Sequence, residues 1–384
     1  MRIRRGIRFL FVSSTLATAT QARADEWADT LWRYAAAETP SGDAAALDAF
    51  ADLLAADTAA LGATARRLPL PNGDALLVER PGERVGKPAL LLAHHDTVHP
   101  VGSVPLRRDG DVLHGPGVYD MKGGLVVVLA AWDALRDAGV PARASRLLLT
   151  PDEEIGSPTS SALVLEQAAQ AAYALGLEPP HPDGALKTSR MGSTRWRVSV
   201  AGRAAHAALD PGAGVSAIDE LVDQLLAVRA IAAEHPDVLV NVGMLGGGGR
   251  TNVVPDAASA DVGLRFADLA TEEAFLARLA ALAPVRPGAV VTPQVVTRRP
   301  AWAPSPASDE LLAAVAAAGA LVGQPVAGRA AAGAADTNLT GAAGLPSLDG
   351  FGPLGAGAHA ATEHVLLASL PRRAALLAAT LATV

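Results

Sequence analysis

The sequence predicts an α/β protein in which a mostly parallel, helix-covered sheet is interrupted by a smaller inserted ferredoxin-like α+β domain. Three observations predict this fold class. Short apolar runs alternate with helical patterns from about residue 25 to residue 187, as in sheets covered by helices on both faces. Between residues 192 and 298 the order of segments becomes βαββαβ, which is the split ferredoxin-like unit. After residue 299 the α/β pattern returns, so the smaller domain is an insertion.

Length and composition agree with two domains. The chain has 384 residues, of which 50% are hydrophobic and only 4% are aromatic. This is more apolar material than one compact core usually holds, and the core must be built from Ala, Leu and Val. The predicted divisions are a signal peptide at 1–24, a catalytic domain at 25–191 and 299–384, and a lid domain at 192–298.

The first 24 residues have the three parts of a secretory signal. A basic start with Arg4 and Arg5 leads into the mildly apolar stretch 9–19, and Ala22-Arg23-Ala24 has the small-x-small pattern of a cleavage site. The paired arginines also match a twin-arginine export signal. We therefore expect a secreted or periplasmic protein, with a cytoplasmic location as the alternative. No segment reaches the roughly 20 apolar residues of a membrane span, so the mature form is expected to have no membrane partner.

Each element of the first domain has a local signal. Two helical patterns come first, and the second opens after Ser41, a residue type that favours the N-cap position. A later helix starts near Gly123 and Gly124 and is expected to end at Gly139, since glycine favours the position after a helix. Four apolar runs have the length of buried strands. The predicted helices are 27–37, 43–61 and the segment from after Asp120 to 139, and the predicted strands are 75–79, 88–93, 146–150 and 171–177.

The inserted domain and the final part of the chain follow the same rules. Alternation of apolar and polar residues predicts strands, a period near 3.6 predicts helices, and Pro255 marks a break in one strand. The predicted elements, in chain order, are strand 194–201, helix 215–233, strand 238–245, strand 252–266, helix 272–283, strand 290–297, helix 309–318, strand 346–348 and helix 369–381.

The composition excludes two classes of partner. The net charge is −7, whereas nucleic acids and anionic membranes both favour basic patches. Neither is expected as a partner. The chain has no cysteine, which removes disulfides and thiolate metal ligands.

Two adjacent acids, Glu153 and Glu154, are the strongest functional signal in the chain. They come just after the apolar run 146–150. Two like charges at the end of a buried strand repel each other and are costly to desolvate. Such a pair is stable when a cation neutralises one carboxylate and the other is kept for proton transfer.

Other histidines and acids come after strands in the same way. His94 and Glu178 each follow an apolar run, and the carboxyl ends of neighbouring strands in an open α/β sheet converge on one edge. Asp120 lies in a Gly-rich turn tight enough to let its carboxylate bridge two ions, and Asp96 can accept the second imidazole proton of His94. Together with His359 far downstream, these residues predict a two-zinc hydrolase, because zinc accepts His nitrogen and carboxylate oxygen.

These motifs resemble those of the M20 metallopeptidases, most closely the glutamate carboxypeptidase (carboxypeptidase G2-like) branch. The resemblance extends from about Trp32 to the end of the chain. The matching motifs are His-x-Asp at 94–96, Asp-x-Lys-Gly-Gly at 120–124, Glu-Glu at 153–154, Glu178 and His359.

The resemblance implies a role for each matching residue. Zinc is the implied metal, and Co²⁺ and Mn²⁺ suit similar ligands. The implied roles are one zinc ion on His94, Asp120 and Glu178, a second on Asp120, Glu154 and His359, general base for Glu153, and orientation of a ligand for Asp96.

The inserted domain carries further motifs of that family. The run ending at His206 resembles the lid motif, whose histidine reaches across a homodimer to the partner's active site and stabilises the oxyanion. Asn252 matches a residue that faces the substrate. Arg265 matches the position that binds the substrate's terminal carboxylate, with Arg299 or Arg298 as a second candidate. The planar fork of arginine suits that task, because it binds carboxylate through two parallel hydrogen bonds.

The implied activity is hydrolysis of an amide bond next to a free carboxylate in a small peptide or N-acyl amino acid. A glutamate-type carboxypeptidase is the first hypothesis. Residues 333–336 read Gly-Ala-Ala-Asp where relatives often carry Gly-Gly-(Ser/Thr)-Asp, so the preferred substrate side chain stays open. Two alternatives remain. One is an N-acyl-amino-acid deacylase, similar to acetylornithine deacetylase or succinyl-diaminopimelate desuccinylase, and the other is an inactive protein on the same scaffold that binds amino acids or peptides.

Overall fold

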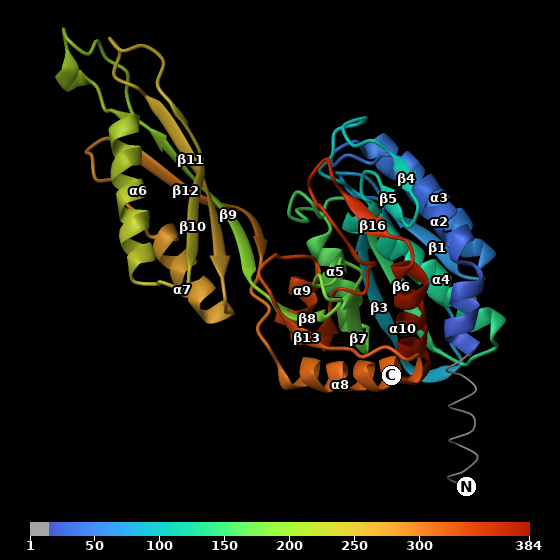
Figure 1. Cartoon of the computed structure of the whole chain (residues 1–384). Coiled ribbons are helices and arrows are strands. Elements are labelled where there is room, and N and C mark those ends of the chain that lie inside the picture. Colours follow the sequence, from blue (N-terminus) through green and yellow to red (C-terminus); the bar gives the residue numbers. More distant parts are fainter. Residues whose placement is uncertain (1–14) are drawn as a thin grey trace. The chain divides into compact units, whose positions relative to one another are not determined.

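The computed structural model describes residues 15–384, which divide into two compact units (Figure 1). The first unit contains the described residues up to Ser189 together with Pro304–Ala331 and Ala335–Val384. The second unit contains Arg190–Ala303 and Ala332–Ala334. The predicted α/β fold class is confirmed, because sheets and helices combine in both units. The first 14 residues of the predicted signal peptide lie outside the described part of the chain.

The first unit is built on a six-stranded sheet. Its strands are β1 (Thr64–Leu68), β2 (Ala75–Arg80), β3 (Arg84–His94), β6 (Arg143–Thr150), β7 (Tyr173–Gly176) and β14 (Ser347–Leu348). Their order is β1-β2-β6-β3-β7-β14. The pairs β6–β3, β3–β7 and β7–β14 are parallel, whereas β1–β2 and β2–β6 are antiparallel. The sheet is therefore mixed, with one parallel half.

Helices cover both faces of this sheet because strand side chains alternate in direction. Leu147 and Leu149 of β6 belong to one apolar cluster, and Leu148 between them belongs to another. Each fully buried leucine stabilises the fold by about 1.5–3 kcal/mol. The first cluster includes residues of α2 (Ala24–Ala36), α3 (Ala44–Ala60), α4 (Gly123–Asp137), α8 (Pro306–Leu321) and α10 (Ser369–Thr383), and the second includes residues of α5 (Ser161–Ala169) and α9 (Thr337–Ala342).

Shorter elements complete the first unit. A short irregular turn, Val118–Lys122, leads directly into α4, and its residues Asp120 and Met121 have non-helical backbone angles. The remaining strands are β4 (Arg107–Asp109), β5 (Val112–His114), β15 (Gly355–Ala356) and β16 (His364–Leu366), in a sheet of order β15-β16-β5-β4, and the pair β8 (Leu186–Arg190) and β13 (Gly328–Ala331).

The second unit has the predicted βαββαβ order. Its elements are β9 (Gly192–Ala201), a 3-10 turn (Pro211–Ala213), α6 (Ala217–Ala233), β10 (Leu239–Gly247), β11 (Ala257–Phe266), α7 (Leu269–Ala280) and β12 (Val290–Arg299). The sheet order is β10-β11-β9-β12, with every pair antiparallel. Alternate residues of β11 are buried in a separate core that α6 and α7 complete. The unit therefore has its own hydrophobic core.

Two local predictions are wrong. Ser41 does not cap α3, because Asp43 is the N-cap and accepts a hydrogen bond from the Ala46 N–H at 3.1 Å. Ser41 instead donates its hydroxyl to Asp96 Oδ2 at 2.8 Å. The strand predicted to begin at Asn252 begins only at Ala257, since residues 251–252 form a turn and Val253 makes only an isolated bridge, with His206.

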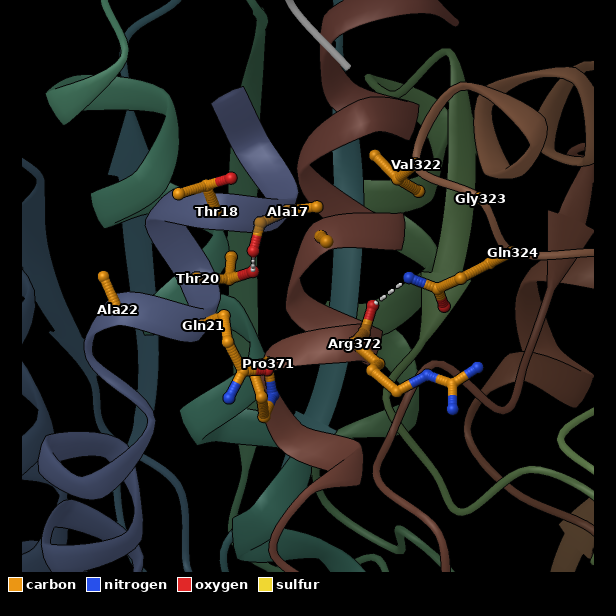
Figure 2. A pocket seen from close by; sticks show the side chains of 11 residues that line it. Ala17, Thr18, Thr20, Gln21, Ala22, Val322, Gly323, Gln324, Pro371 and Arg372 are labelled. Atoms are coloured by element: carbon orange, nitrogen blue, oxygen red, sulfur yellow. Dashed lines mark hydrogen bonds between the residues drawn. The ribbon is translucent and has the colours of Figure 1, made fainter. Parts of the chain in front are cut away.

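The last part of the predicted signal peptide is helical over residues 15–22. Leu16 is buried in the apolar cluster that also holds Leu147 and Leu149 of β6, and Arg23 forms an ion pair with Asp133. A pocket lies beside this helix, and its other side is formed by residues 322–324 and the start of α10 (Figure 2). The helix contributes Ala17, Thr18, Thr20, Gln21 and Ala22 to the lining. Across residues 15–384, no helix is both long enough and apolar enough to span a bilayer.

Candidate metal centre

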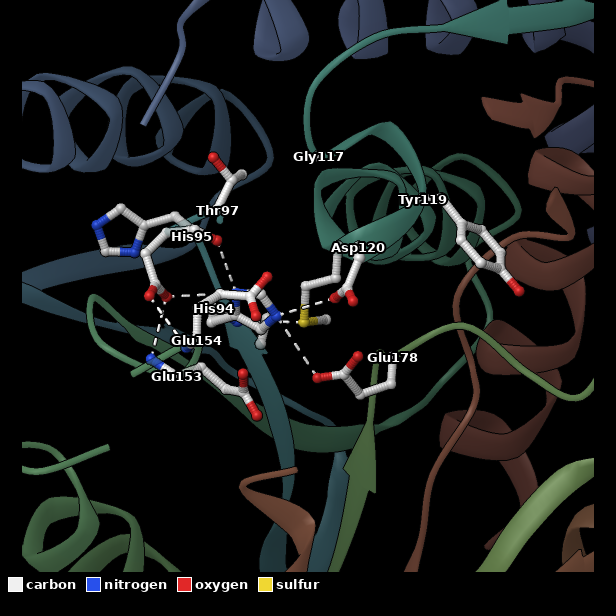
Figure 3. A network of polar contacts seen from close by, with 12 residues as sticks. His94, His95, Thr97, Gly117, Tyr119, Asp120, Glu153, Glu154 and Glu178 are labelled. Atoms are coloured by element: carbon white, nitrogen blue, oxygen red, sulfur yellow. Dashed lines mark hydrogen bonds and ion pairs between the residues drawn. The ribbon is translucent and has the colours of Figure 1, made fainter. Parts of the chain in front are cut away.

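Strands in the parallel half of the first unit's sheet end at candidate ligands. β3 ends at His94, which is paired with Thr150 at the end of β6. The turn after β6 carries Glu153 and Glu154, and Glu178 comes two residues after the end of β7. Because parallel neighbours have their carboxyl ends at the same edge, these side chains meet there (Figure 3).

A first cluster joins His94, Asp120 and Glu178. His94 Nε2 lies 3.2 Å from Asp120 Oδ1 and 3.6 Å from Glu178 Oε1. One ligand-type atom of each residue lies within 4.8 Å of the others. His94 Nδ1 lies 2.9 Å from the main-chain oxygen of Asp96. In the neutral ring Nδ1 therefore carries the proton and donates it there, which leaves the lone pair of Nε2 available to a metal ion.

A second cluster joins Asp120, Glu154 and His359. His359 Nε2 lies 3.1 Å from Glu154 Oε2 and 3.4 Å from Asp120 Oδ2. The same 4.8 Å limit holds for these three residues. His359 has a φ of 63°, a left-handed conformation that is costly for a residue other than glycine and is common at functional positions. The two oxygens of Asp120 thus serve different clusters.

The clusters concentrate negative charge in a buried place. Burial, and next the charge of Asp120, raise the pKa of Glu178 well above its usual range. Burial also raises the pKa of Glu154. Hydrogen bonds with Asp120 and Glu154 raise the pKa of His359 to about 11. Repulsion among carboxylates at such short range is relieved when cations bind between them.

Asp96 connects the first cluster to the glutamate pair. The carboxylate is fully buried. It accepts hydrogen bonds from the main-chain N–H groups of Glu153 and Glu154, both at 3.1 Å, and from the Ser41 hydroxyl. Its Oδ1 lies 3.3 Å from His94 Nδ1, farther than its main-chain oxygen. Asp96 therefore orients the main chain of the glutamate pair as well as the imidazole.

We expect Asp96→Asn to weaken metal binding by about 10–100-fold, the usual effect of changing a group that orients a ligand. Asparagine has one acceptor oxygen, so it cannot serve both glutamate N–H groups and the Ser41 hydroxyl as a carboxylate does. Competition with a chromophoric chelator, with zinc as the probe, measures the affinity. Ser41→Ala is the matched control, because it removes one donor and leaves the carboxylate. Equal affinities for Asp96→Asn and the wild type would contradict this role.

Among the described residues, Glu153 belongs to neither cluster, although it is only 6% exposed. It lines a small pocket together with His94, Glu178 and Asp336. Burial lowers the pKa of His94, but hydrogen bonds with Asp120 and Asp96, together with the charge of Glu153, raise it well above its usual value. Burial, the charge of Asp120 and the charge of Glu153 raise the pKa of Glu178. A buried carboxylate beside a candidate metal site but outside the ligand sets has the placement that a proton acceptor needs.

The donor atoms of both clusters fit zinc. Each cluster combines one imidazole nitrogen with two carboxylates, and zinc is held by such sets in catalytic sites that keep a position for water. Cobalt and manganese accept the same donors.

His206 lies in the second unit, between β9 and α6, and is exposed. Its Nδ1 accepts hydrogen bonds from the main-chain N–H groups of Ala208 and Leu209, at 3.2 and 3.1 Å. Nδ1 is therefore unprotonated in the neutral ring, and the proton is on Nε2, which can donate. The Ala207 N–H donates to the Asn252 carbonyl at 3.0 Å, so His206 and Asn252 lie on adjoining segments.

Arg265 and Arg299 lie in one row of the second unit's sheet. Ser193 of β9 pairs with Arg265 of β11 on one side and with Arg299 of β12 on the other. Residues paired directly across strands share a face. Burial, and next the positive charge of Arg299, lower the pKa of Arg265. Arg298 lies on the opposite face, where its Nε donates to Glu272 Oε1 at 2.8 Å. Of the two predicted candidates, only Arg299 shares a face with Arg265.

Three residues around the clusters were not predicted. Asp152 is fully buried and accepts hydrogen bonds from the Thr159 N–H and the Ser160 hydroxyl, which fixes the turn after the glutamate pair. The run Asp-Glu-Glu was the available signal for it. His99 and Glu363 are paired at 2.7 Å. They stand 264 positions apart in the chain, and no local pattern marks such a contact.

These features define an α/β protein with two overlapping ligand clusters at the carboxyl edge of its sheet, an arrangement suited to metal-dependent hydrolysis. Residues 90–383 match the model of Peptidase family M20/M25/M40. The chain belongs to this family of metal-dependent hydrolases.

Two named proteins are similar to this chain in sequence. Carboxypeptidase G2 of Pseudomonas sp. (strain RS-16) is 31% identical over 359 residues, covering 90% of this chain and 86% of that protein. Succinyl-diaminopimelate desuccinylase of Maricaulis maris (strain MCS10) is 31% identical over 244 residues, covering 58% of this chain and 61% of that protein.

Solved structures agree on the fold. Aminopeptidase PepT of Bacillus cereus ATCC 10987 has a TM-score of 0.71 at 19% identity, covering 94% of this chain and 98% of that one. An M20 family metallo-carboxypeptidase of Sulfolobus solfataricus has a TM-score of 0.71 at 15% identity, covering 93% and 99%. At these identities the likeness concerns the fold alone.

Proposed function

We propose that this protein is a dizinc hydrolase that cleaves an amide bond next to a free carboxylate, as a glutamate-type carboxypeptidase does. The observation that carries the proposal is that Asp120 belongs to two three-residue clusters, beside a buried Glu153 that belongs to neither. The 31% identity to carboxypeptidase G2 over 90% of the chain supports the carboxypeptidase type.

In this proposal Glu153 moves the proton. Zinc ions at such a site lower the pKa of water towards about 7 and polarise a carbonyl oxygen. The Glu153 carboxylate accepts a proton from the attacking water and returns it to the leaving nitrogen. Asp96 supports this step by holding the Glu153 N–H at 3.1 Å, which fixes the main chain that carries the base.

Two groups of the second unit act on the substrate in this proposal. Arg265 and Arg299 bind its terminal carboxylate through their guanidinium groups. This role is supported by their place in one row of the sheet, and by the effect of Arg299, whose charge after burial lowers the pKa of Arg265. The His206 Nε2–H donates a hydrogen bond to the oxyanion that forms at the substrate's carbonyl group. This role is supported by the N–H groups of Ala208 and Leu209, which donate to Nδ1 and so leave the ring proton on Nε2. Asn252, on the segment next to His206, faces the substrate.

A panel of substrates tests the proposal. The full-length protein is given peptidyl-glutamate, N-acyl-glutamate, N-acetylornithine and N-succinyl-diaminopimelate, and the released amino acid is quantified with metal analysis on the same sample. We expect fastest release from the glutamate substrates, two zinc ions per chain, loss of activity with a chelator and recovery with zinc. Binding of these compounds without hydrolysis by the zinc-loaded protein would identify an inactive binding protein instead.

A deacylase is the second candidate, supported by the 31% identity to a succinyl-diaminopimelate desuccinylase over 58% of the chain. Both candidates use the same base and the same clusters and differ in which acyl group they release. Faster turnover of N-succinyl-diaminopimelate or N-acetylornithine than of the glutamate substrates would favour the deacylase.

A homodimer through the second unit is also proposed. Within residues 15–384, the edge strand β10 pairs with β11 alone, and it exposes Met244 and Leu245. Helix α6 exposes a stripe at Ile218, Val222 and Leu226. An open edge strand beside an apolar stripe favours pairing with a second copy.

Light scattering should give twice the chain mass, and Val222→Glu combined with Met244→Glu should give the monomer. A monomeric wild type would reject the dimer.

Export by the N-terminal segment is proposed from its sequence pattern. Cleavage after Ala24 would remove the helix at 15–22 and also Arg23, so Asp133 would keep Arg136 as its partner. N-terminal sequencing of protein recovered from the periplasm or medium should begin at Asp25. An intact N-terminus in the cytoplasmic fraction would support the cytoplasmic alternative.

A further inference from the structure

Glu363 is a buried carboxylate with four hydrogen-bond donors. Its Oε1 accepts from the main-chain N–H groups of Tyr119 and Asp120, at 2.8 and 2.9 Å. Its Oε2 accepts from the Gly117 N–H at 3.0 Å and lies 2.7 Å from His99 Nε2. The side chain is 0% exposed. Such a carboxylate satisfies three main-chain donors that would otherwise be buried without an acceptor.

The three segments that meet at Glu363 all carry candidate ligands. Asp120 donates its own N–H to Glu363, and its two carboxylate oxygens serve the two clusters. His359 stands four residues before Glu363, in the same turn of the chain. His99 stands five residues after His94. The Glu363 carboxylate therefore connects three chain segments. One carries Asp120, the ligand shared by both clusters, and the other two carry His94 and His359.

Local geometry leaves little room for adjustment at this point. Gly117 has a φ of 71°, and a Cβ added there would lie 2.8 Å from Thr97 Cγ2. Gly357 has a φ of 81°, and a Cβ there would lie 2.9 Å from the Glu363 nitrogen. The main-chain oxygen of Glu363 also accepts the Gly115 N–H at 3.3 Å. The segments are held by both the main chain and the side chain of Glu363.

We propose that Glu363 is a positioning residue for the metal centre, acting through the main chain of Gly117, Tyr119 and Asp120. Among the described residues it belongs to neither ligand cluster, so it acts on the centre through Asp120 and its neighbours. By fixing the Asp120 N–H it sets where both oxygens of the shared carboxylate lie, so a small shift disturbs the two clusters together. This inference rests on the two-metal centre of the proposed function.

Glu363→Gln tests the inference, because glutamine keeps the size but replaces one acceptor oxygen with an NH₂ group. In either orientation of the amide that group meets a main-chain N–H donor to donor, at Gly117 or at Tyr119 and Asp120. The metal-free full-length protein is titrated with zinc in competition with a chromophoric chelator. We expect Glu363→Gln to bind zinc about 10–100-fold more weakly than the wild type, as for other groups that orient ligands.

Glu220→Gln is the matched control. Glu220 is also a fully buried carboxylate, and it accepts the N–H groups of Val285 and Arg286 at 3.0 and 2.7 Å in the second unit. We expect both variants to lower the melting temperature of the metal-free protein, but only Glu363→Gln to weaken zinc binding. Zinc should then raise the melting temperature of Glu363→Gln less than that of Glu220→Gln, since ligand stabilisation follows affinity.

The outcomes separate this inference from the proposed function. A wild type that binds no zinc rejects the metal centre itself. A wild type that binds zinc, with Glu363→Gln binding equally well, rejects only the positioning role and leaves Glu363 as a stabilising group. If Glu363→Gln does not fold, Glu363→Asp decides, because its shorter side chain keeps the charge but cannot reach all four donors. Unchanged zinc affinity of Glu363→Asp overturns the proposal, and weakened affinity supports it.

Discussion

Glu153→Gln is expected to reduce kcat by about 10²–10⁴-fold, the usual contribution of a general acid–base group. Glutamine is close to glutamate in size and keeps the N–H that Asp96 accepts, so the turn after β6 stays in place. Among the described residues Glu153 is in neither ligand cluster, so the zinc content should stay near that of the wild type. Steady-state kinetics and metal analysis on the same preparation measure both effects.

Glu154→Gln is the control for that result, because Glu154 is the adjacent residue and belongs to the second cluster with Asp120 and His359. It should lose metal as well as activity. If Glu153→Gln loses zinc while Glu154→Gln retains it, the roles of the two glutamates are exchanged.

His206→Ala is expected to lower kcat by about 10²–10³-fold, the effect of removing one donor to an oxyanion. The side chain is exposed, and so are the N–H groups of Ala208 and Leu209, from which it accepts hydrogen bonds. Folding should therefore be retained, which circular dichroism checks. His235→Ala, in the same unit, is the matched control and should keep wild-type activity.

Mixing two inactive variants tests whether His206 acts across a dimer. Glu153→Gln supplies His206 but lacks the base, and His206→Ala supplies the base but lacks the donor. Statistical exchange should restore about a quarter of the wild-type activity, because about half of the dimers are mixed and each has one complete site. If the two variants carry different affinity tags, co-purify as mixed dimers and still give an inactive mixture, His206 acts in its own subunit's site.

The strand ends were the part of the centre that could be predicted from the sequence. His94 and Glu178 follow apolar runs, and the sheet does place those runs side by side. The order of elements in the second unit was also predictable, because amphipathic period and length mark each helix and strand there.

Hydrogen bonds between distant segments could not be predicted in this way. Ser41 looked like a helix cap because its type favours that position, yet its hydroxyl bonds Asp96, 55 positions away. Glu363 gives no local signal either, since its donors lie more than 240 positions earlier. Residue type and spacing identify ligands at strand ends, whereas the groups that orient those ligands depend on how distant turns meet.

The main segment of the second unit, Arg190–Ala303, begins and ends at one antiparallel contact. The Arg190 N–H donates to the Trp302 carbonyl at 2.9 Å, and the Trp302 N–H donates back to Arg190 at 3.0 Å. A module whose two ends adjoin in this way can be excised and its neighbours rejoined by a short linker. With a core of its own, the fragment 190–303 is expected to fold autonomously, and a cooperative melting transition of the isolated fragment would demonstrate it.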